Sequence, residues 1–586
     1  MHLFRQTCLT ILIIACLFAT TPAADYFTPK DAPQPNIIII MSDDMGISDI
    51  GCYGSEIKTP VLDTLAKDGV RFKQFYNTGR CCPTRAALLT GLYSHQAGIG
   101  HMMNDRGSDG YRGELAPTCV TIAEALKPAG YSTYMIGKWH VTKNVHDTGD
   151  VHNWPLQRGF DKFYGMVSGA GSFFDPKSLA RGNKNISPEN DEKYKPKTYY
   201  FTDAISDNAV AFFKEHQQEE KKSGKKKPFF AYVAYTAAHW PMHALPEDIA
   251  KYKGDYDQGW DKISKTRLAK MIELGLIDKA WTTAPRDPSA PAWDSQNDRQ
   301  KKVQASRMEV YAAMVDRMDQ GIGKIVEELK RQGKFENTLI LFLQDNGACA
   351  EKFGLQAGIH PPLDTKERRP AMAKDALQFD MAPKWTRDGR PVHRGADLDL
   401  SLGTDNTYIG YGLPWANASN TPFRRYKHWE HEGGISSPLI VSWPAFFKKS
   451  DTKTGGWVAG PGHLIDLMAT SLDVAGAKYP EKRKDAKVTP CEGESLIPML
   501  LGKKRDDEIL YWEHEGNRAV RKGDWKLVSA GRGAWELYEM TKDRCEMHDL
   551  AKEMPEKVKE LDKLWQAWAK RAQVIPNKPA AKKKKK

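Results

Sequence analysis

Short apolar runs that end in polar residues recur along the chain, and they constrain its fold more than any other feature. The first, Asn36–Met41, is mostly isoleucine and is followed at once by Ser42-Asp43-Asp44. Four later runs have a similar character: Tyr131–Ile136, Phe229–Tyr235, Thr338–Leu343 and Leu439–Trp443. Unbroken apolar runs of this length are typical of strands buried on both faces, as in a parallel sheet.

Helical stretches separate these runs. Thr59-Pro60 has the sequence of a helix start, and Thr121–Glu124 has that of a capping box. From Met308 to Leu329, apolar residues recur at helical spacing, as on a helix that covers a sheet face. Strands that alternate with helices predict an α/β fold, with a large mixed, mainly parallel sheet flanked by helices.

The C-terminal part of the chain has a different pattern of apolar residues. From about Cys491 the apolar runs are shorter, and Pro555–Arg571 has the pattern of an amphipathic helix. We expect a linker over residues 25–35, a main domain over 36–485, a smaller C-terminal α+β domain over 486–575 and a lysine-rich tail over 576–586. Residues 246–305 and 351–420 are polar and read as insertions, the first of them near the entrance of a site.

The first residues have the composition of an export signal. A short basic start precedes an apolar run from Cys8 to Ala19, and the small residues Pro22-Ala23-Ala24 follow. This order predicts a signal peptide over residues 1–24 and a secreted or periplasmic protein. Ile13-Ile14-Ala15-Cys16 also fits a lipoprotein box, so a lipid anchor on Cys16 is the minority alternative. No later segment has the length and apolarity of a transmembrane helix.

The formal net charge of +12 raises the question of a nucleic-acid partner. Lys582–Lys586 and Arg5 supply half of it, and a terminal lysine run is usually a solvated tail. We therefore expect no nucleic-acid binding. The net positive charge instead suits binding to an anionic polysaccharide or an anionic surface.

Residues Arg80–Leu92 place a cysteine, a proline and an arginine at the start of a helix. Pro83 suits the first turn, so Cys81 comes just ahead of the helix N-terminus, where free N–H groups favour an anion. At its spacing, Arg85 can turn its guanidinium toward whatever Cys81 holds. The alternative is a buried or disulfide-bonded Cys81, since an oxidising compartment permits disulfides and the cysteine spacings select no pairing.

Acidic and amide side chains follow two of the apolar runs. Asp43 and Asp44 come after the first run, and Asp345 and Asn346 come after the fourth. Asp43-Asp44 alone, after a strand, is more often a turn than a pair of ligands. Brought together at strand ends, the two pairs form an oxygen-only site that suits Ca²⁺ or Mg²⁺ rather than Zn²⁺.

Cationic and imidazole side chains gather in similar places. Lys138 and His140 follow the second run, His239 follows the third, and Lys427 precedes the fifth. Each one alone would usually be a surface lysine or a core histidine. Together with a helix N-terminus they predict a pocket for a tetrahedral oxyanion.

The pattern Cys81-x-Pro83-Thr84-Arg85 followed by Ala-Ala-Leu-Leu-Thr-Gly resembles the signature of the type I sulfatases, which are formylglycine-dependent, arylsulfatase-like members of the alkaline phosphatase superfamily. Gly137-Lys138-Trp139-His140 resembles a second motif of that family. The similarity extends from Asn36 to about Val574. Two positions depart mildly from the pattern: residue 84 is Thr where Ser is also common, and residue 82 is a second cysteine.

The resemblance implies a modified residue, a metal and a division of roles. A formylglycine-generating enzyme would convert Cys81 to 3-oxoalanine, whose hydrated aldehyde is the family's nucleophile. Calcium, with magnesium as the alternative, would be held by Asp43, Asp44, Asp345 and Asn346. Arg85 and Lys138 would contact the nucleophile and the sulfate, His140 would remove a proton, and His239 and Lys427 would serve the leaving group. Ser168 is the candidate for an additional serine near the sulfate.

These features predict an arylsulfatase-type sulfuric ester hydrolase that releases an alcohol and inorganic sulfate. A sulfated polysaccharide fits the export signal and the basic balance as the natural substrate. A phosphatase or phosphonate monoester hydrolase on the same fold is the first alternative, because phosphate esters are also tetrahedral. An inactive exported glycan-binding protein is the second.

Overall fold

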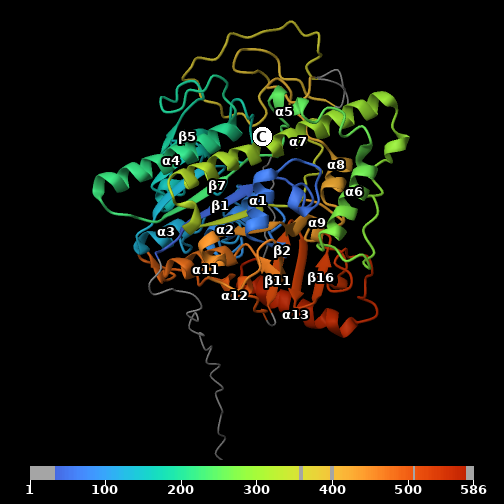
Figure 1. Cartoon of the computed structure of the whole chain (residues 1–586). Coiled ribbons are helices and arrows are strands. Elements are labelled where there is room, and N and C mark those ends of the chain that lie inside the picture. Colours follow the sequence, from blue (N-terminus) through green and yellow to red (C-terminus); the bar gives the residue numbers. More distant parts are fainter. Residues whose placement is uncertain (1–32, 356–359, 396–400, 506–507, 576–586) are drawn as a thin grey trace, which may run out of the picture.

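The computed structural model of the chain describes residues 33–355, 360–395, 401–505 and 508–575 (Figure 1). The predicted signal peptide, most of the linker and the lysine-rich tail lie outside these residues. Within the described ranges, no helix has the length and apolarity needed to cross a membrane.

The core of the molecule is a mixed sheet in which five neighbouring strands run parallel. These are β8 (Thr338–Gln344), β1 (Asn36–Ser42), β7 (Phe229–Ala234), β3 (Ser132–Gly137) and β4 (Lys162–Met166). One side is completed by β10 (Leu439–Ser442), β2 (Val70–Tyr76), β11 (Trp457–His463) and β9 (Ser436–Ser437), and the other by β5 (Leu179–Arg181) and β6 (Lys184–Asn185). All five predicted strands are confirmed.

Two helical layers enclose this sheet, and the alternation of β1 shows why its isoleucines are all buried. Ile38 and Ile40 pack in one core cluster with residues of α1 (Pro60–Asp68), α4 (Phe201–Ser223) and α7 (Asp298–Arg331). Ile37 and Ile39 pack in a second with α2 (Cys81–Thr90), α3 (Ile122–Leu126) and α11 (Asp466–Ala475). Figure 1 shows α4 and α7 on one side of the sheet and α3 and α11 on the other. Successive strand residues point to opposite faces, so both layers are anchored to the same strand.

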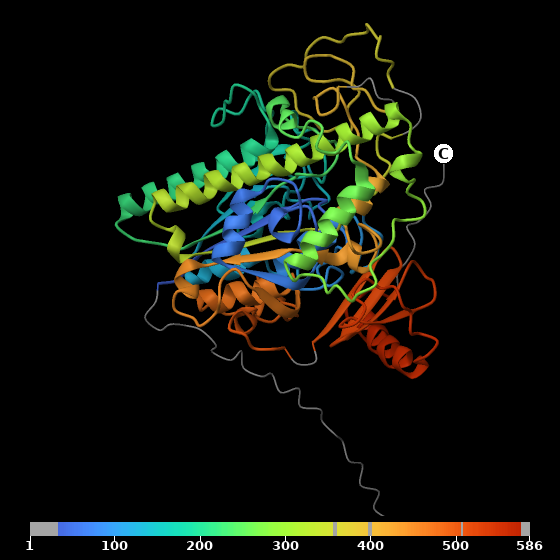
Figure 2. The ribbon, with the colours of Figure 1, turned by 45° about the vertical axis from the view of Figure 1, so that its right-hand side comes forward.

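The predicted C-terminal α+β unit is a four-stranded antiparallel sheet with one helix (Figure 2). Its elements are β14 (Ile509–His514), β15 (Asn517–Lys522), β16 (Trp525–Ser529), β17 (Glu536–Glu539) and α13 (Pro555–Arg571). Val520, Leu527 and Trp565 belong to the same core cluster as α2, and Trp512 Nε1 donates to Asn77 O over 2.8 Å. The small sheet is therefore packed into the main domain.

A buried ion cluster joins the two sheets. Glu432 lies at the start of α9 (Glu432–Ile435), where Lys526 Nζ donates to its Oε1 and Arg544 Nε to its Oε2, each over 2.9 Å. Burial disfavours the carboxylate charge, but Lys526 and Arg544 outweigh it and lower the pKa of Glu432 from 4.5 to about 2. A carboxylate with a depressed pKa stabilises the fold above its unfolded pKa, and that contribution is lost as the pH falls through the folded value.

Glu432→Gln should therefore lower the free energy of unfolding by about 3 kcal/mol at neutral pH, because Arg544 loses its carboxylate partner and Lys526 keeps only Glu546. The difference from the wild type should shrink as the pH is lowered from about 4.5 toward 2, since the wild-type carboxylate becomes neutral there. Urea unfolding of both proteins at several pH values measures this difference in unfolding free energy. The control is Glu556→Gln, whose exposed pairing with Lys559 should contribute little. A difference that does not change with pH would contradict the assignment.

The topology brings the functional candidates to one edge of the sheet. The carboxyl ends of the parallel strands β1, β3, β7 and β8 share that edge. Strand β10 runs antiparallel to β8, with Leu439 opposite Leu343, so the segment that precedes β10 arrives at the same place. Because β10 runs in the opposite direction, Lys427, which precedes it, lies beside residues that follow the parallel strands.

Residues 246–305 differ from expectation. They form α5 (Pro246–Ala250), α6 (Gly259–Glu273) and the start of α7, and Arg267 of α6 forms a buried ion pair with Asp49 over 2.5 Å. This segment packs on the side of the domain instead of lining the site. The remaining short elements are α8 (Leu413–Ser419), α10 (Pro444–Phe447), α12 (Ile497–Leu500), β12 (Lys482–Arg483) and β13 (Ala486–Lys487).

Candidate active site

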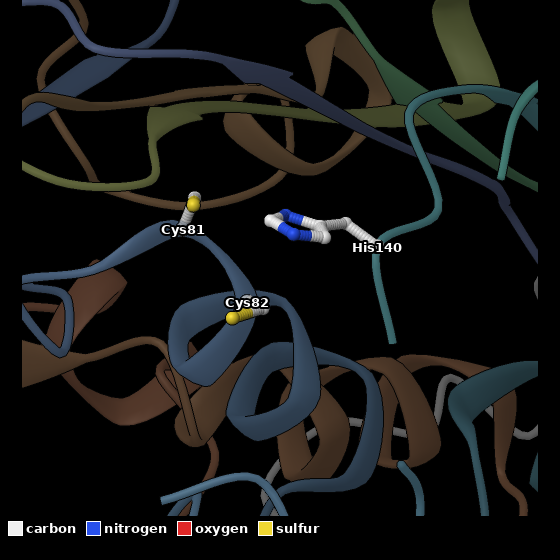
Figure 3. Close-up of side chains that lie close together, drawn as sticks. All are labelled: Cys81, Cys82 and His140. Atoms are coloured by element: carbon white, nitrogen blue, oxygen red, sulfur yellow. The ribbon is translucent and has the colours of Figure 1, made fainter. Parts of the chain in front are cut away.

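Cys81 is the first residue of α2, one position further into the helix than the sequence suggested. Arg80 is the extended residue before it, and Pro83 occupies the third helical position. Figure 3 shows the Cys81 side chain beside His140. Cys82 is the next residue of the helix. The metal-binding atoms of these three side chains lie within 4.8 Å of one another. Position 81 thus combines the positive end of a helix with a neighbouring imidazole.

The four residues predicted to hold a metal meet at the sheet edge, and all four are fully buried. Asp44 N donates to Asp345 Oδ1 over 3.2 Å, and Asn346 Nδ2 donates to Asp44 Oδ1 over 2.7 Å. The ends of β1 and β8 are neighbours in the sheet, which explains why residues so distant in sequence come together.

The predicted cations surround this acidic cluster. Lys138 Nζ donates to Asp43 Oδ2 over 2.6 Å, and Arg85 Nη2 donates to Asp345 Oδ2 over 2.8 Å. The remaining pair is Lys427 with Asp44, over 2.7 Å. Burial alone would disfavour the ammonium, but Asp44 raises the pKa of Lys427 well above its usual value. Three buried carboxylates therefore face three cationic side chains.

Two oxygens of the acidic cluster are suited to binding a cation. Asp43 Oδ1 and Asn346 Oδ1 are buried, and neither has a hydrogen-bond partner among the described residues. Burial, with Asp43 next to it, raises the pKa of Asp345 to about 8. Orphaned buried oxygens are rare in folded proteins, and a hard divalent ion would satisfy both atoms. The donor set suits calcium or magnesium.

Two histidines complete the site, and both are held neutral. Burial lowers the pKa of His140 to about 4 and that of His239 also to about 4. The Nε2 atom of His239 lies 3.3 Å from Asp44 Oδ2, and its Nδ1 lies 2.6 Å from Trp240 O. Each imidazole is therefore unprotonated at neutral pH, with a lone pair on one ring nitrogen.

Comparison with known proteins decides the family. Residues 35–477 match the family described as Sulfatase. The chain belongs to the sulfatase family. Residues 424–572 also match the C-terminal part of N-sulphoglucosamine sulphohydrolase. The chain is a sulfatase-family enzyme, a hydrolase, and its fold class agrees with the one predicted.

Relatives of this sulfatase cover nearly its whole length. An uncharacterized sulfatase of Schizosaccharomyces pombe is 32% identical over 91% of this chain and 93% of its own. The arylsulfatase of Klebsiella aerogenes is 31% identical over 80% of this chain and 93% of its own. The crystal structure of Ps i-CgsB in complex with k-i-k-neocarrahexaose has a TM-score of 0.61 and 25% identity, covering 94% of this chain and 96% of that one.

A cavity of about 800 Å³ opens above Cys81. Five residues singled out in the sequence line it: Cys81, His140, Ser168, His239 and Lys427. Asp43, Asp44, Arg85, Lys138, Asp345 and Asn346 lie behind them and are absent from its lining. The hydroxyl of Ser168 donates to Lys177 O over 3.2 Å, so this serine is held by the cavity wall.

The sequence did not single out several residues of the cavity wall. They are Arg80, Met102, Met103, Lys177, Trp240, Glu351, Lys352, Phe353 and Met381. The only sequence signal for any of them was that Arg80 and Trp240 are next to motif residues in the chain. Four members come from the insertion 351–420, whereas no described residue of 246–305 lines the cavity.

The described cysteines of the sulfatase are all free, so a disulfide at Cys81 is not formed in the structure. Cys82, the second cysteine of the motif, does not line the cavity. Its Sγ lies 3.4 Å from His101 O and 3.5 Å from Met102 Sδ. Only Cys81 of this pair faces the space in which a substrate would bind.

Proposed function

We propose that this sulfatase is an arylsulfatase-type enzyme that hydrolyses sulfate esters with a modified Cys81 and a bound calcium ion. One observation carries the proposal. Cys81 lies at the N-terminus of α2 in the cavity wall, with Lys427 in the same wall and the acidic cluster, Arg85 and Lys138 directly behind. An exported chain that meets a formylglycine-generating enzyme would acquire the modification, in keeping with the secreted or periplasmic location we expect.

The modified residue at position 81 would be 3-oxoalanine, which supplies a hydrated aldehyde as an oxygen nucleophile toward sulfur. His140 is placed to take a proton from the group at position 81, because its imidazole is neutral and lies beside that side chain. Arg85 lies four residues further along α2, fully buried, and contributes a fixed positive charge behind the nucleophile.

Asp43, Asp44, Asp345 and Asn346 would hold the calcium ion, and magnesium is the alternative. A divalent ion there would supply positive charge that polarises the reacting oxygens. Without an ion, Asp43 and Asp44 pair with Lys138 and Lys427, and Asp345 faces Arg85. The site with its ion therefore has an excess of positive charge, which favours an anionic ester.

The leaving alcohol needs a proton or a cation as its negative charge grows. Lys427 and His239 both reach the cavity, and their Nζ and Nε2 atoms lie 3.5 Å apart. Lys427 is charged, and it is therefore our first candidate for stabilising the leaving oxygen. His239, which is neutral in the free enzyme, can hand on a proton only after it has gained one.

Sulfate release from a chromogenic aryl sulfate, measured beside phosphate release from the matching aryl phosphate, tests the proposed function. The protein should be made in a host that generates formylglycine. We expect sulfate release to exceed phosphate release by orders of magnitude and to fall when calcium is chelated. Faster phosphate release would favour the phosphatase or phosphonate hydrolase alternative. Absence of both activities in the modified, calcium-loaded protein would favour the inactive glycan-binding alternative.

A sulfated polysaccharide is the substrate class we propose. The Ps i-CgsB structure contains a carrahexaose, and the cavity here is large enough for several sugar units. Apolar side chains such as Trp240 and Phe353 stack at 4.1 Å between ring centroids on one wall. Lys177 and Lys352 also line the cavity, and neither forms an ion pair within the described part of the chain. These two lysines suit additional sulfate groups of a polymer.

Lys177→Ala/Lys352→Ala should raise KM for a sulfated oligosaccharide by about tenfold and leave an aryl sulfate nearly unaffected. The small substrate has no second anionic group for the lysines to contact. Steady-state kinetics on both substrates measure the effect. Lys324→Ala, which removes a lysine of α7 paired with Asp207, is the matched control. Equal losses on the two substrates would contradict a role in polymer recognition.

A further inference from the structure

Three histidines surround Glu515 where the C-terminal sheet meets the main domain. His514 ends β14, and Glu515 begins the turn to β15. His428 Nδ1 lies 3.0 Å from Glu515 Oε2, and His101 Nε2 lies 2.9 Å from Glu515 Oε1. None of these residues lines the catalytic cavity. The cluster is therefore separate from the sulfatase site, although His428 directly follows Lys427.

His514 is the member of this cluster whose polar atoms are left without hydrogen bonds in the described structure. Its side chain is fully buried, and neither ring nitrogen has a hydrogen-bond partner in the described structure. The Nε2 atom points toward the cluster, 3.8 Å from Glu515 Oε1. A buried imidazole with two unsatisfied nitrogens is costly, because it has lost its hydration without replacement. Burial also lowers the pKa of His514 well below its usual value, which leaves a neutral ring with a free lone pair.

We propose that His428, His514 and Glu515 bind a transition-metal dication of the zinc type. Their metal-binding atoms already lie within 4.8 Å of one another. Two imidazoles and a carboxylate suit zinc, whereas calcium prefers oxygen ligands alone. Three protein ligands also leave a position for water. This site is independent of the proposed function.

His101 orients the other members and does not need to bind the ion. Its ring stacks on that of His514 with centroids 5.5 Å apart, while its Nε2 contacts Glu515. On the far side of His428, the Nε2 atom contacts Arg80 and lies 3.1 Å from Glu351 Oε1. The ion would therefore use Nδ1 of His428, the nitrogen that faces Glu515. Such supporting contacts fix the rings of metal-binding histidines.

An ion at this site would tie the turn after β14 to the segment that carries Lys427. Asn517 Nδ2 already donates to His428 O over 2.7 Å, and Glu351 accepts from Trp240 Nε1 over 2.9 Å. Trp240 and Glu351 both belong to the wall of the catalytic cavity. Metal binding should consequently raise the thermal stability of the protein, since ligands of the folded state stabilise it.

Calorimetric titration with Zn²⁺ alone tests the proposal. The full chain should carry Cys81→Ala, which removes the competing cluster of Cys81, Cys82 and His140, and should be saturated with calcium. We expect one zinc ion per chain with a micromolar or tighter Kd. His514→Gln and His428→Gln should each weaken binding by at least about tenfold. His548→Gln, at a histidine with a 65% exposed side chain, is the control and should change nothing.

Cobalt provides a second readout that does not depend on affinity. Co²⁺ in a site of imidazole and carboxylate ligands should give visible absorption bands without the near-ultraviolet charge-transfer band of a thiolate ligand. His514→Gln should lose the visible bands while retaining the far-ultraviolet circular dichroism of the folded chain. Absence of zinc binding, or zinc binding unchanged in both histidine variants, would overturn the proposal.

Discussion

Replacing Cys81 by serine should abolish the turnover of sulfate esters while leaving the fold intact. Serine has nearly the same volume and fits the first turn of α2, where Cys81 is buried. Its single hydroxyl can accept a sulfate group, but the same carbon holds no second hydroxyl whose deprotonation could expel it again. We therefore expect kcat to fall by at least about a thousandfold.

Sulfate release from an aryl sulfate and intact-protein mass spectrometry measure this prediction together. The serine variant should retain the mass of one SO₃ group after incubation with substrate, whereas Cys81→Ala should retain none. Cys82→Ala is the matched control, because it removes a buried sulfur from the same helix turn without touching the cavity. A serine variant that turns over at the wild-type rate would show that position 81 is not the nucleophile.

The strand pattern was sufficient to predict that the residues of the acidic cluster lie together. Asp43, Asp44, Asp345 and Asn346 each directly follow an apolar run, and parallel neighbours present their carboxyl ends at a common edge. The same rule does not place Lys427, which precedes its strand. Its arrival at the site depends on the antiparallel direction of β10, and an apolar run does not encode the direction of its strand.

Contacts between distant loops could not be read from the sequence. Glu351 reaches Arg80 and Trp240 through side chains whose positions depend on the whole insertion 351–420. Likewise, His428 and His514 approach each other only because the C-terminal sheet packs on the main domain. The polar composition of residues 246–305 suggested an insertion near the site entrance, but α6 of this segment carries a buried face instead.

Charge balance links the structure of the site to its proposed chemistry. Without a metal, each of Asp43, Asp44 and Asp345 is paired with a cation at 2.6–2.8 Å. Paired in this way, Lys138 and Lys427 are largely neutralised and would attract a sulfate ester only weakly. A divalent ion among the carboxylates would restore the positive field of Lys138 and Lys427. Metal binding and substrate binding should therefore be coupled.

Asp345→Asn should separate these two roles of the acidic cluster. The substitution preserves the shape of the side chain, yet it removes from the metal site the carboxyl group that also faces Arg85 at 2.8 Å. We expect kcat/KM for an aryl sulfate to fall by at least about a hundredfold. The rise in melting temperature that calcium gives the wild type should also diminish, because stabilisation by a ligand follows its affinity.

Asp319→Asn is the matched control for that experiment. Asp319 lies on α7, is 1% exposed, and accepts hydrogen bonds from Val61 N and Leu62 N over 3.0 and 2.9 Å, so its loss tests a buried carboxyl group outside the site. It should lower the melting temperature but leave the calcium-dependent rise and the activity at their wild-type values. If Asp345→Asn instead keeps the full calcium-dependent rise and loses activity alone, Asp345 acts by holding Arg85 and does not bind the metal.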